Sequence, residues 1–124
     1  MGGLGALALA RDHADVVERL VLIAPYLGPQ GLLEKIQAAG GPARWTADDP
    51  KDPAQRMWMW LKRRAEPGAR GPTIELAFGA SDRLALGHRL LAQLLPPAAV
   101  HEEAGAHDWV TWRKLWKRLW APPG

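Results

Sequence analysis

The sequence predicts an α/β fold in which about three parallel strands are flanked by helices. Residues 19–25 form an apolar run without polar alternation that ends in a proline. Such a run indicates a strand buried on both faces, as in a parallel sheet. Further along the chain, strand-like stretches alternate with helix-like ones, which is the pattern of right-handed βαβ units. The length of 124 residues and the hydrophobic fraction of 48% indicate one small domain or a piece of a larger one.

Residues 1–25 are expected to contribute one helix and one strand. Residues 2–14 are rich in leucine and alanine, with small residues on one side. We therefore expect a helix that packs closely against a flat neighbour. The apolar run that follows is the first expected strand.

Residues 26–71 differ in character from the segments on either side. Glycines, prolines and an acidic run over 48–52 break this insertion into short pieces. One helix start is well marked, with Asp52 as the N-cap and Pro53 at the first helical position. Gln55 is expected to complete a capping box with Asp52.

Residues 72–124 again predict regular structure. The expected elements are a strand over 73–79, a helix over 83–95 stopped by two prolines, a short strand over 98–103 and a final helix over 109–120. The order helix, strand, insertion, strand, helix, strand, helix favours a parallel sheet.

Three short stretches stand at the ends of these predicted elements. Residues 1–10 read Met-Gly-Gly-Leu-Gly-Ala-Leu-Ala-Leu-Ala, residues 78–82 read Phe-Gly-Ala-Ser-Asp, and residues 105–109 read Gly-Ala-His-Asp-Trp. Together they resemble the α/β-hydrolase family, in the chain order that this family uses. The first resembles the continuation of the G-x-S-x-G nucleophile elbow after its serine, the second the turn with the triad acid, and the third the loop with the triad histidine. Residues 16–25 similarly resemble the strand that follows the elbow helix.

The resemblance implies a partial α/β-hydrolase fold with a helical lid insertion. It divides the chain into the elbow helix and first strand (1–25), a lid or cap (26–71), and the remaining core with the acid and histidine (72–124). Asp82 would accept a hydrogen bond from His107, and His107 would act as the general base. The residue after the serine would supply one oxyanion-hole amide, and that residue is Met1.

The sequence departs from the family because no residue precedes Met1, so the nucleophile is missing. We therefore expect a C-terminal fragment of a serine hydrolase that acts on a small carboxylic ester or related acyl substrate, and we expect this chain to be inactive. The alternative is a short, non-catalytic binding module derived from the same fold. Dehalogenases, thioesterases and C–C hydrolases of this fold are not distinguished, because fold does not determine chemistry.

Several of these residues have a plainer interpretation. Ser81, the only serine, lacks the second glycine of an elbow and is expected to form a turn or a helix N-cap. Without the other two motifs Asp82 would be interpreted as an N-cap, and with them it is expected to be the triad acid. Asp108 is a second candidate partner of His107. The other histidines are expected to be surface or packed residues, namely His13, His88 and His101.

Two groups of tryptophans leave alternatives open. Met57, Trp58 and Trp60 would either line an acyl pocket under the lid or pack the lid down. The final helix places tryptophans at helical spacing with lysines and arginines between them. Such a helix lies on a membrane surface or, as we expect here, covers the sheet with its tryptophans.

Composition limits the remaining classes. The sequence has no cysteine, which excludes disulfides and thiolate zinc sites, and we expect neither a metal nor a cofactor. The net charge of +3 comes without a clustered basic face, so no nucleic-acid partner is expected. No apolar run is long enough to span a membrane, and we expect a cytoplasmic protein. An unpaired edge of the strand over residues 20–24 would favour self-association.

Overall fold

The computed structural model describes residues 6–7, 9, 11–13, 19–69 and 71–119. Within these ranges it contains one three-stranded sheet in the order β1-β2-β3, with both strand pairs parallel. The strands are β1 (Arg19–Ile23), β2 (Thr73–Gly79) and β3 (Val100–Glu103). The described part thus confirms an α/β protein with a parallel sheet.

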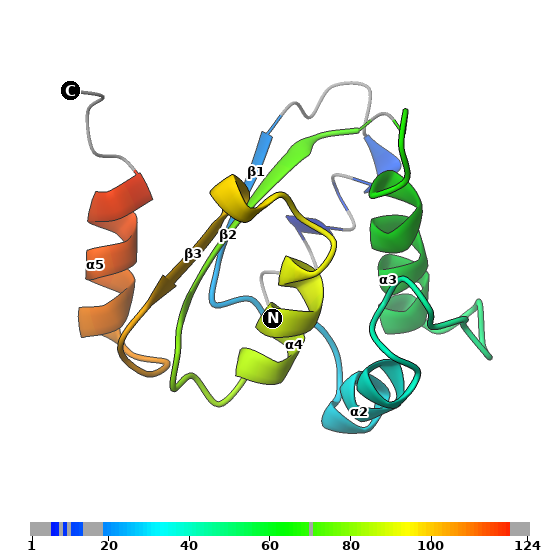
Figure 1. Ribbon diagram of the computed structural model, residues 1–124, viewed down its shortest axis with the longest axis horizontal. Coiled ribbons are helices and arrows are strands. Elements are labelled where there is room, and N and C mark those ends of the chain that lie inside the picture. Colours follow the sequence, from blue (N-terminus) through cyan, green and yellow to red (C-terminus); the bar gives the residue numbers. More distant parts are fainter. Residues whose placement is uncertain (1–5, 8, 10, 14–18, 70, 120–124) are drawn as a thin grey trace.

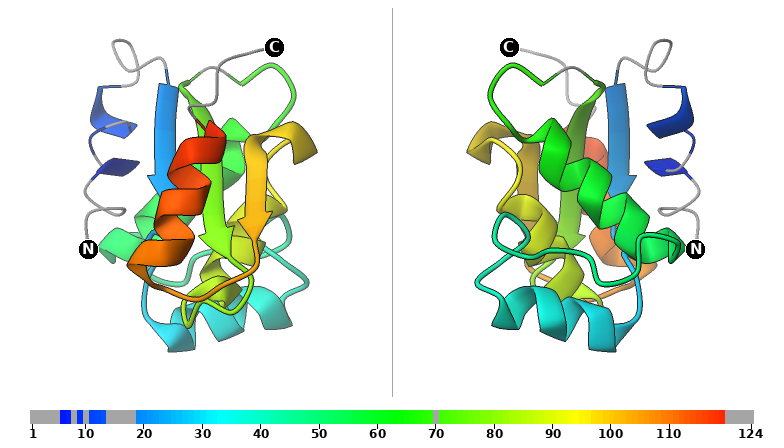
Figure 2. Two further views of the ribbon diagram at one scale, coloured as in Figure 1. Left: turned by 90° about the vertical axis from the view of Figure 1, so that its left-hand side faces the viewer. Right: turned by 90° about the vertical axis from the view of Figure 1, so that its right-hand side faces the viewer.

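Helices cover the sheet on both faces and at one end (Figures 1 and 2). The described helices are α2 (Gln30–Ala38), α3 (Pro53–Arg64), α4 (Ala85–Ala92) and α5 (Trp109–Leu119), with a 3₁₀ turn η1 (Pro97–Ala99) before β3. Helix α5 lies on one face, α3 and α4 lie on the other, and α2 lies beyond the carboxyl ends of the strands. None of the helices in these ranges is long and apolar enough to cross a membrane.

The central strand β2 is buried on both faces. Its residues Ile74, Leu76 and Phe78 point to one face and are at most 2% exposed, and Ala77 on the other face is fully buried. Leu76 is in register with Leu22 of β1. Strand β1, in contrast, is an edge strand of the described sheet with only Leu22 buried, so the expectation that it is buried on both faces is wrong.

The start of α3 forms as predicted at Asp52 but not at Gln55. Asp52 accepts a hydrogen bond from the backbone N–H of Gln55 at 3.0 Å, and Pro53 occupies the first turn. The predicted capping box is wrong, because Gln55 Oε1 accepts from the backbone N–H groups of Asp48 and Asp49, both at 3.1 Å. The Gln55 side chain therefore bonds to the acidic run before α3 and not to the backbone N–H of Asp52.

The helix expected over 83–95 is shorter than predicted and spans Ala85–Ala92. It starts late because the Asp82 carboxylate accepts the backbone N–H of Leu84 at 2.8 Å, which forms a turn before the helix. It stops early because Leu94 and Leu95 bond three residues back, to Leu91 and Ala92.

Helix α5 does not pack on the sheet through the face that carries its tryptophans, contrary to the prediction from the sequence pattern. Its buried residues are Thr111 and Leu115, whereas Trp109 is 68% and Trp116 is 55% exposed. The expectation that the tryptophans cover the sheet is therefore wrong for these two. Asp108 Oδ1 accepts the backbone N–H of Thr111 at 2.8 Å, and this cap fixes the first turn with Thr111 facing inward.

The expectations for residues 1–5, 8, 10, 14–18 and 120 lie outside the described residues. They include Met1 as an oxyanion donor, most of the residues assigned to the elbow helix, and the start of the strand stretch at residue 16. The described residues 6, 7, 9, 11 and 12 of this segment are helical.

Candidate active site

Asp82 and His107 lie at the same edge of the sheet because they follow neighbouring parallel strands. Asp82 comes shortly after β2, and His107 comes shortly after β3. The carboxyl ends of parallel strands share one edge, which is where α/β folds build ligand sites. His107 Nδ1 lies 2.7 Å from Asp82 Oδ2, with the Asp82 side chain fully buried and that of His107 23% exposed.

Both oxygens of the Asp82 carboxylate are engaged. Oδ1 accepts from the backbone N–H of Leu84 at 2.8 Å, and Oδ2 faces His107. The backbone N–H of Asp82 itself donates to Gly79 O at 3.0 Å. Asp82 is therefore not the N-cap of α4, which is Leu84. Its carboxylate instead closes a turn before the helix and faces His107 at the same time, which holds it in one orientation.

The loop that carries His107 rests on the end of β2. The backbone N–H of Ser81 donates to Gly105 O, and that of Ala80 donates to Glu103 O, both at 2.8 Å. A Cβ on Gly79 would lie 2.5 Å from Gly105 O and 2.9 Å from Ala106 O. Only glycine fits at position 79 without moving the backbone of this loop.

The pair fixes which ring nitrogen of His107 is available. The Asp82 carboxylate only accepts hydrogen bonds, so Nδ1 carries the proton and the neutral ring keeps its lone pair on Nε2. The Trp112 ring meets the His107 ring edge-on, with centroids 4.8 Å apart and planes at 87°. A histidine held in this tautomer by a buried carboxylate is suited to accept a proton at Nε2.

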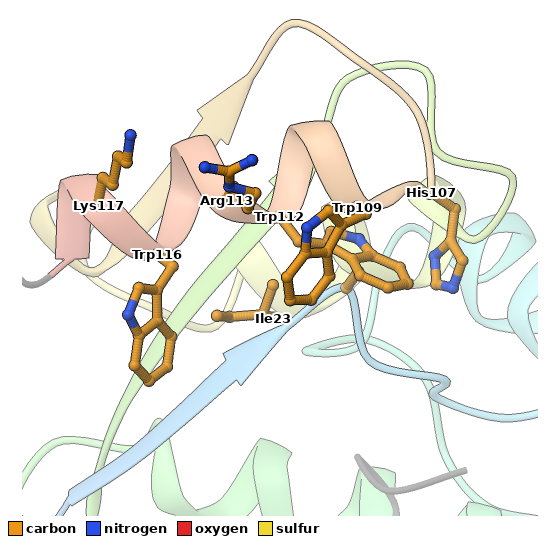
Figure 3. Close-up of a pocket in the computed structure, with 8 residues that line it drawn as sticks. Ile23, His107, Trp109, Trp112, Arg113, Trp116 and Lys117 are labelled. Atoms are coloured by element: carbon orange, nitrogen blue, oxygen red, sulfur yellow. The ribbon is translucent and has the colours of Figure 1, made fainter.

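Two cavities border His107. One of about 670 Å³ lies between β1 and α5, and Figure 3 shows its lining residues. The other, of about 520 Å³, is lined by Ala6, the end of β1, and residues 24–26 and 83–84. Both volumes lie within the range of roughly 300–1,000 Å³ that small-molecule sites occupy.

Ala24 borders both cavities and has a strained backbone. Its φ is 49°, a left-handed value that is uncommon for residues other than glycine. Its N–H donates to Ala77 O at 2.8 Å, which continues the ladder between β1 and β2 past the end of β1. Strain of this kind costs on the order of 1–3 kcal/mol and is concentrated at functional sites in other proteins.

His88 is a polar residue near the site to which the sequence assigned no specific role. It is fully buried in α4, and its Nε2 donates to Pro25 O at 2.8 Å. Its ring lies 5.1 Å from that of Phe78. Burial lowers the pKa of His88, so the ring is neutral near pH 7. The hydrogen bond ties α4 to the loop that contains the strained Ala24.

The alternative partner Asp108 points elsewhere. Its carboxylate caps α5 at Thr111, and this hydrogen bond lowers the pKa of Asp108. Ser81 is exposed in the turn after β2 and lines neither cavity that borders His107. Ser81 therefore takes the turn role and is not the N-cap of α4, which begins four residues later.

Met57, Trp58 and Trp60 of the insertion, expected either to line an acyl pocket or to pack the lid down, lie in or against the hydrophobic core. Met57 is 2% and Trp58 is 1% exposed, and Trp58 Nε1 donates to Leu27 O at 2.8 Å. Trp60 is partly buried against the same core. None of the three lines a cavity bordered by His107, which favours the interpretation that they pack the insertion down.

The described residues contain no group of three or more histidine, aspartate or glutamate side chains placed to hold a metal ion. In comparisons with known proteins, no family model, curated protein or solved structure significantly matches the chain. The described part of the chain is an α/β protein with a parallel sheet. A buried carboxylate and a histidine form a pair at the carboxyl edge of this sheet.

Proposed function

We propose that this chain carries the acid and the base of a serine hydrolase that cleaves carboxylic esters or related acyl compounds. The observation that supports the proposal is the 2.7 Å contact between His107 Nδ1 and the buried Asp82 carboxylate. The sequence motifs after β2 and β3 resemble those that carry the same two residue types in α/β-hydrolases. Two cavities of small-molecule size adjoin the pair.

In this proposal His107 Nε2 removes the proton from a serine hydroxyl as the serine attacks the acyl carbon. The imidazolium that forms is stabilised by Asp82 and returns the proton to the leaving group. General base catalysis of this kind contributes roughly 10²–10⁴-fold to the rate. Asp82 acts by holding the tautomer and by balancing the charge on His107.

The nucleophile is proposed to come from a polypeptide segment outside these 124 residues. Ser81 is the only serine in the sequence, and it lines neither of the cavities next to His107. The chain alone is expected to leave p-nitrophenyl butyrate unhydrolysed above the buffer rate. Turnover by the chain alone that is lost in His107→Ala would contradict the part of the proposal that concerns the nucleophile.

The test is to sequence the coding region directly upstream and to assay the extended protein. We expect an in-frame Gly-x-Ser before Met1, and esterase activity that falls by about 10⁴ in Asp82→Asn, as occurs when a triad aspartate is replaced. His107→Ala should lose at least as much. Asp108→Asn is the matched control, because Asp108 adjoins His107 in sequence but bonds to Thr111, and an asparagine also caps a helix. An in-frame stop directly upstream, or full activity of the His107→Ala variant, would refute the proposal.

One observation favours the second candidate, a non-catalytic binding module. Trp109 and Trp116 are more than half exposed next to the larger cavity. A module of this kind would keep its ligand binding in His107→Ala and gain no esterase activity when the upstream segment is added.

A further inference from the structure

The larger cavity is an apolar groove between β1 and α5. We call it the tryptophan groove and define it by Ile23 of β1 and by Trp109, Trp112 and Trp116 of α5 (Figure 3). Its lining is predominantly apolar, and its volume is about 670 Å³. Trp109 at 68% and Trp116 at 55% exposed leave large apolar rings in contact with water. Aromatic side chains gathered around one cavity are the usual lining of a small-molecule site.

The groove also carries two cations. Arg113 and Lys117 follow Trp112 and Trp116 in sequence and line the same cavity. Neither has a hydrogen bond or ion pair within the part of the chain that the structure describes. In contrast, Arg118 of the same helix lies 3.5 Å from a carboxylate oxygen of Glu103.

Among the residues that the structure describes, no carboxylate lines the groove. The described lining residues comprise the three tryptophans, Ile23, Ala24, His107 and the two cations, with no aspartate or glutamate. The apolar wall of the groove therefore adjoins two cations, whose charged ends lie on the outer side of α5, away from Ile23 (Figure 3). The complementary ligand has an apolar body and an anionic head.

We propose that the tryptophan groove binds an organic carboxylic acid whose apolar body is a medium-length chain or a ring system. The body lies against the indole rings and Ile23, and the carboxylate lies at Arg113 and Lys117. From Trp109 to Lys117 the helix rises by about 12 Å, at 1.5 Å per residue, which sets the length of the ligand. Binding needs neither a nucleophile nor turnover, so failure of the hydrolase proposal would leave this proposal intact even though His107 borders the groove.

The test is isothermal titration of the purified chain with decanoate and with its neutral isostere decanamide. We expect saturable binding of one decanoate per chain and at least about tenfold weaker binding of decanamide. Raising the ionic strength should weaken the binding of decanoate and leave that of decanamide unchanged, because salt screens the charges of the two cations.

Variants of α5 test the two halves of the groove separately. The double variant Arg113→Gln with Lys117→Gln should reduce decanoate affinity to that of decanamide. Lys114→Gln is the matched control, because it removes a charge from the same exposed helix but Lys114 does not line the groove. Trp109→Ala should weaken both ligands alike. The comparison of the two ligands on the unchanged chain needs no variant, so it stands even if a substitution affects folding.

Three results would overturn the proposal. Equal affinity for decanoate and decanamide would show that the cations play no part. A concentration-dependent dimer that excludes decanoate would show that a second copy of the chain occupies the groove. Binding to vesicles of anionic phospholipid without saturable binding of decanoate would show that the helix face recognises a surface and not a single acid.

Discussion

The contact between the end of β2 and the loop before His107 makes Gly79→Ala the most informative single substitution. Gly79 has a backbone conformation that alanine can adopt, so the effect of the change is steric. The new Cβ would lie 2.5 Å from Gly105 O and 2.9 Å from Ala106 O. Carbon and carbonyl oxygen normally approach no closer than about 3.3 Å, so the strand end and the loop must separate by roughly 0.8 Å.

The cost of this separation follows from what holds the loop in place. Overpacking a tight site costs about 1–3 kcal/mol, and losing the hydrogen bond from Ser81 N–H to Gly105 O adds roughly 1 kcal/mol. We therefore expect Gly79→Ala to lower the free energy of unfolding by about 2–4 kcal/mol. A shift of this size also lengthens the 2.7 Å contact between His107 and Asp82.

Urea unfolding followed by tryptophan fluorescence measures the stability, and the low-field proton resonance of His107 Nδ1–H reports the contact with Asp82. Gly31→Ala is the matched control. No atom lies within 4 Å of a Cβ built on Gly31, an exposed residue of α2. It should stabilise the chain by about 0.5–1 kcal/mol, since alanine favours the helix over glycine. A Gly79→Ala variant within 0.5 kcal/mol of the parent, with an unchanged His107 resonance, would refute the steric reasoning.

Substitutions at three further positions probe two hydrogen bonds and one titration. Burial lowers the pKa of His88 below its usual value of 6.5. As the pH falls below 6.5, the unfolded chain therefore binds more protons than the folded chain. The free energy of unfolding then decreases by up to about 1.4 kcal/mol per pH unit. Urea titrations from pH 7.5 to 5 should show that His88→Gln reduces this loss; an equal loss in the variant would assign it to other groups. Asp52→Ala should lower the free energy of unfolding by about 1 kcal/mol, because the hydrogen bond from the Gln55 N–H to the Asp52 side chain is lost. Asp52→Asn should retain most of the stability that this cap provides. Trp58→Phe should lower the free energy of unfolding by about 1 kcal/mol or more, because it leaves Leu27 O buried without its donor, and a neutral result would mean that water replaces the indole.

The sequence was most informative where one local pattern decides the structure. The position of β1 was predicted from its apolar run, but its burial was not: β1 lies at the edge of the described sheet, and of its residues only Leu22 is buried. The proximity of Asp82 and His107 was predicted from motifs placed after neighbouring parallel strands, and the structure brings the two side chains to 2.7 Å. The N-cap at Asp52 was predicted because capping involves only residues close in sequence.

The sequence was least informative where distant residues decide. The burial of His88 depends on Pro25, 63 residues away, so no local pattern distinguishes it from the other histidines. Gln55 had two sets of backbone donors within reach, and the turn at Asp48 and Asp49 determined which it took. The side that α5 turns to the sheet depends on the packing of Thr111, whereas the tryptophans dominate the sequence pattern.

The short helix α4 is connected to both sides of the site. Just before the helix, the Asp82 carboxylate accepts a hydrogen bond from the Leu84 N–H and faces His107. In the middle of the helix, His88 donates a hydrogen bond to the carbonyl of Pro25, which lines one of the cavities. The position of the acid and the shape of the neighbouring cavity therefore move together when this eight-residue helix moves. Substitutions on the buried side of α4, such as at Gly87 where it meets Leu33, should change both at once. Paired substitutions in the helix and in the loop after β1 should accordingly be non-additive, so the evolution of one side constrains the other.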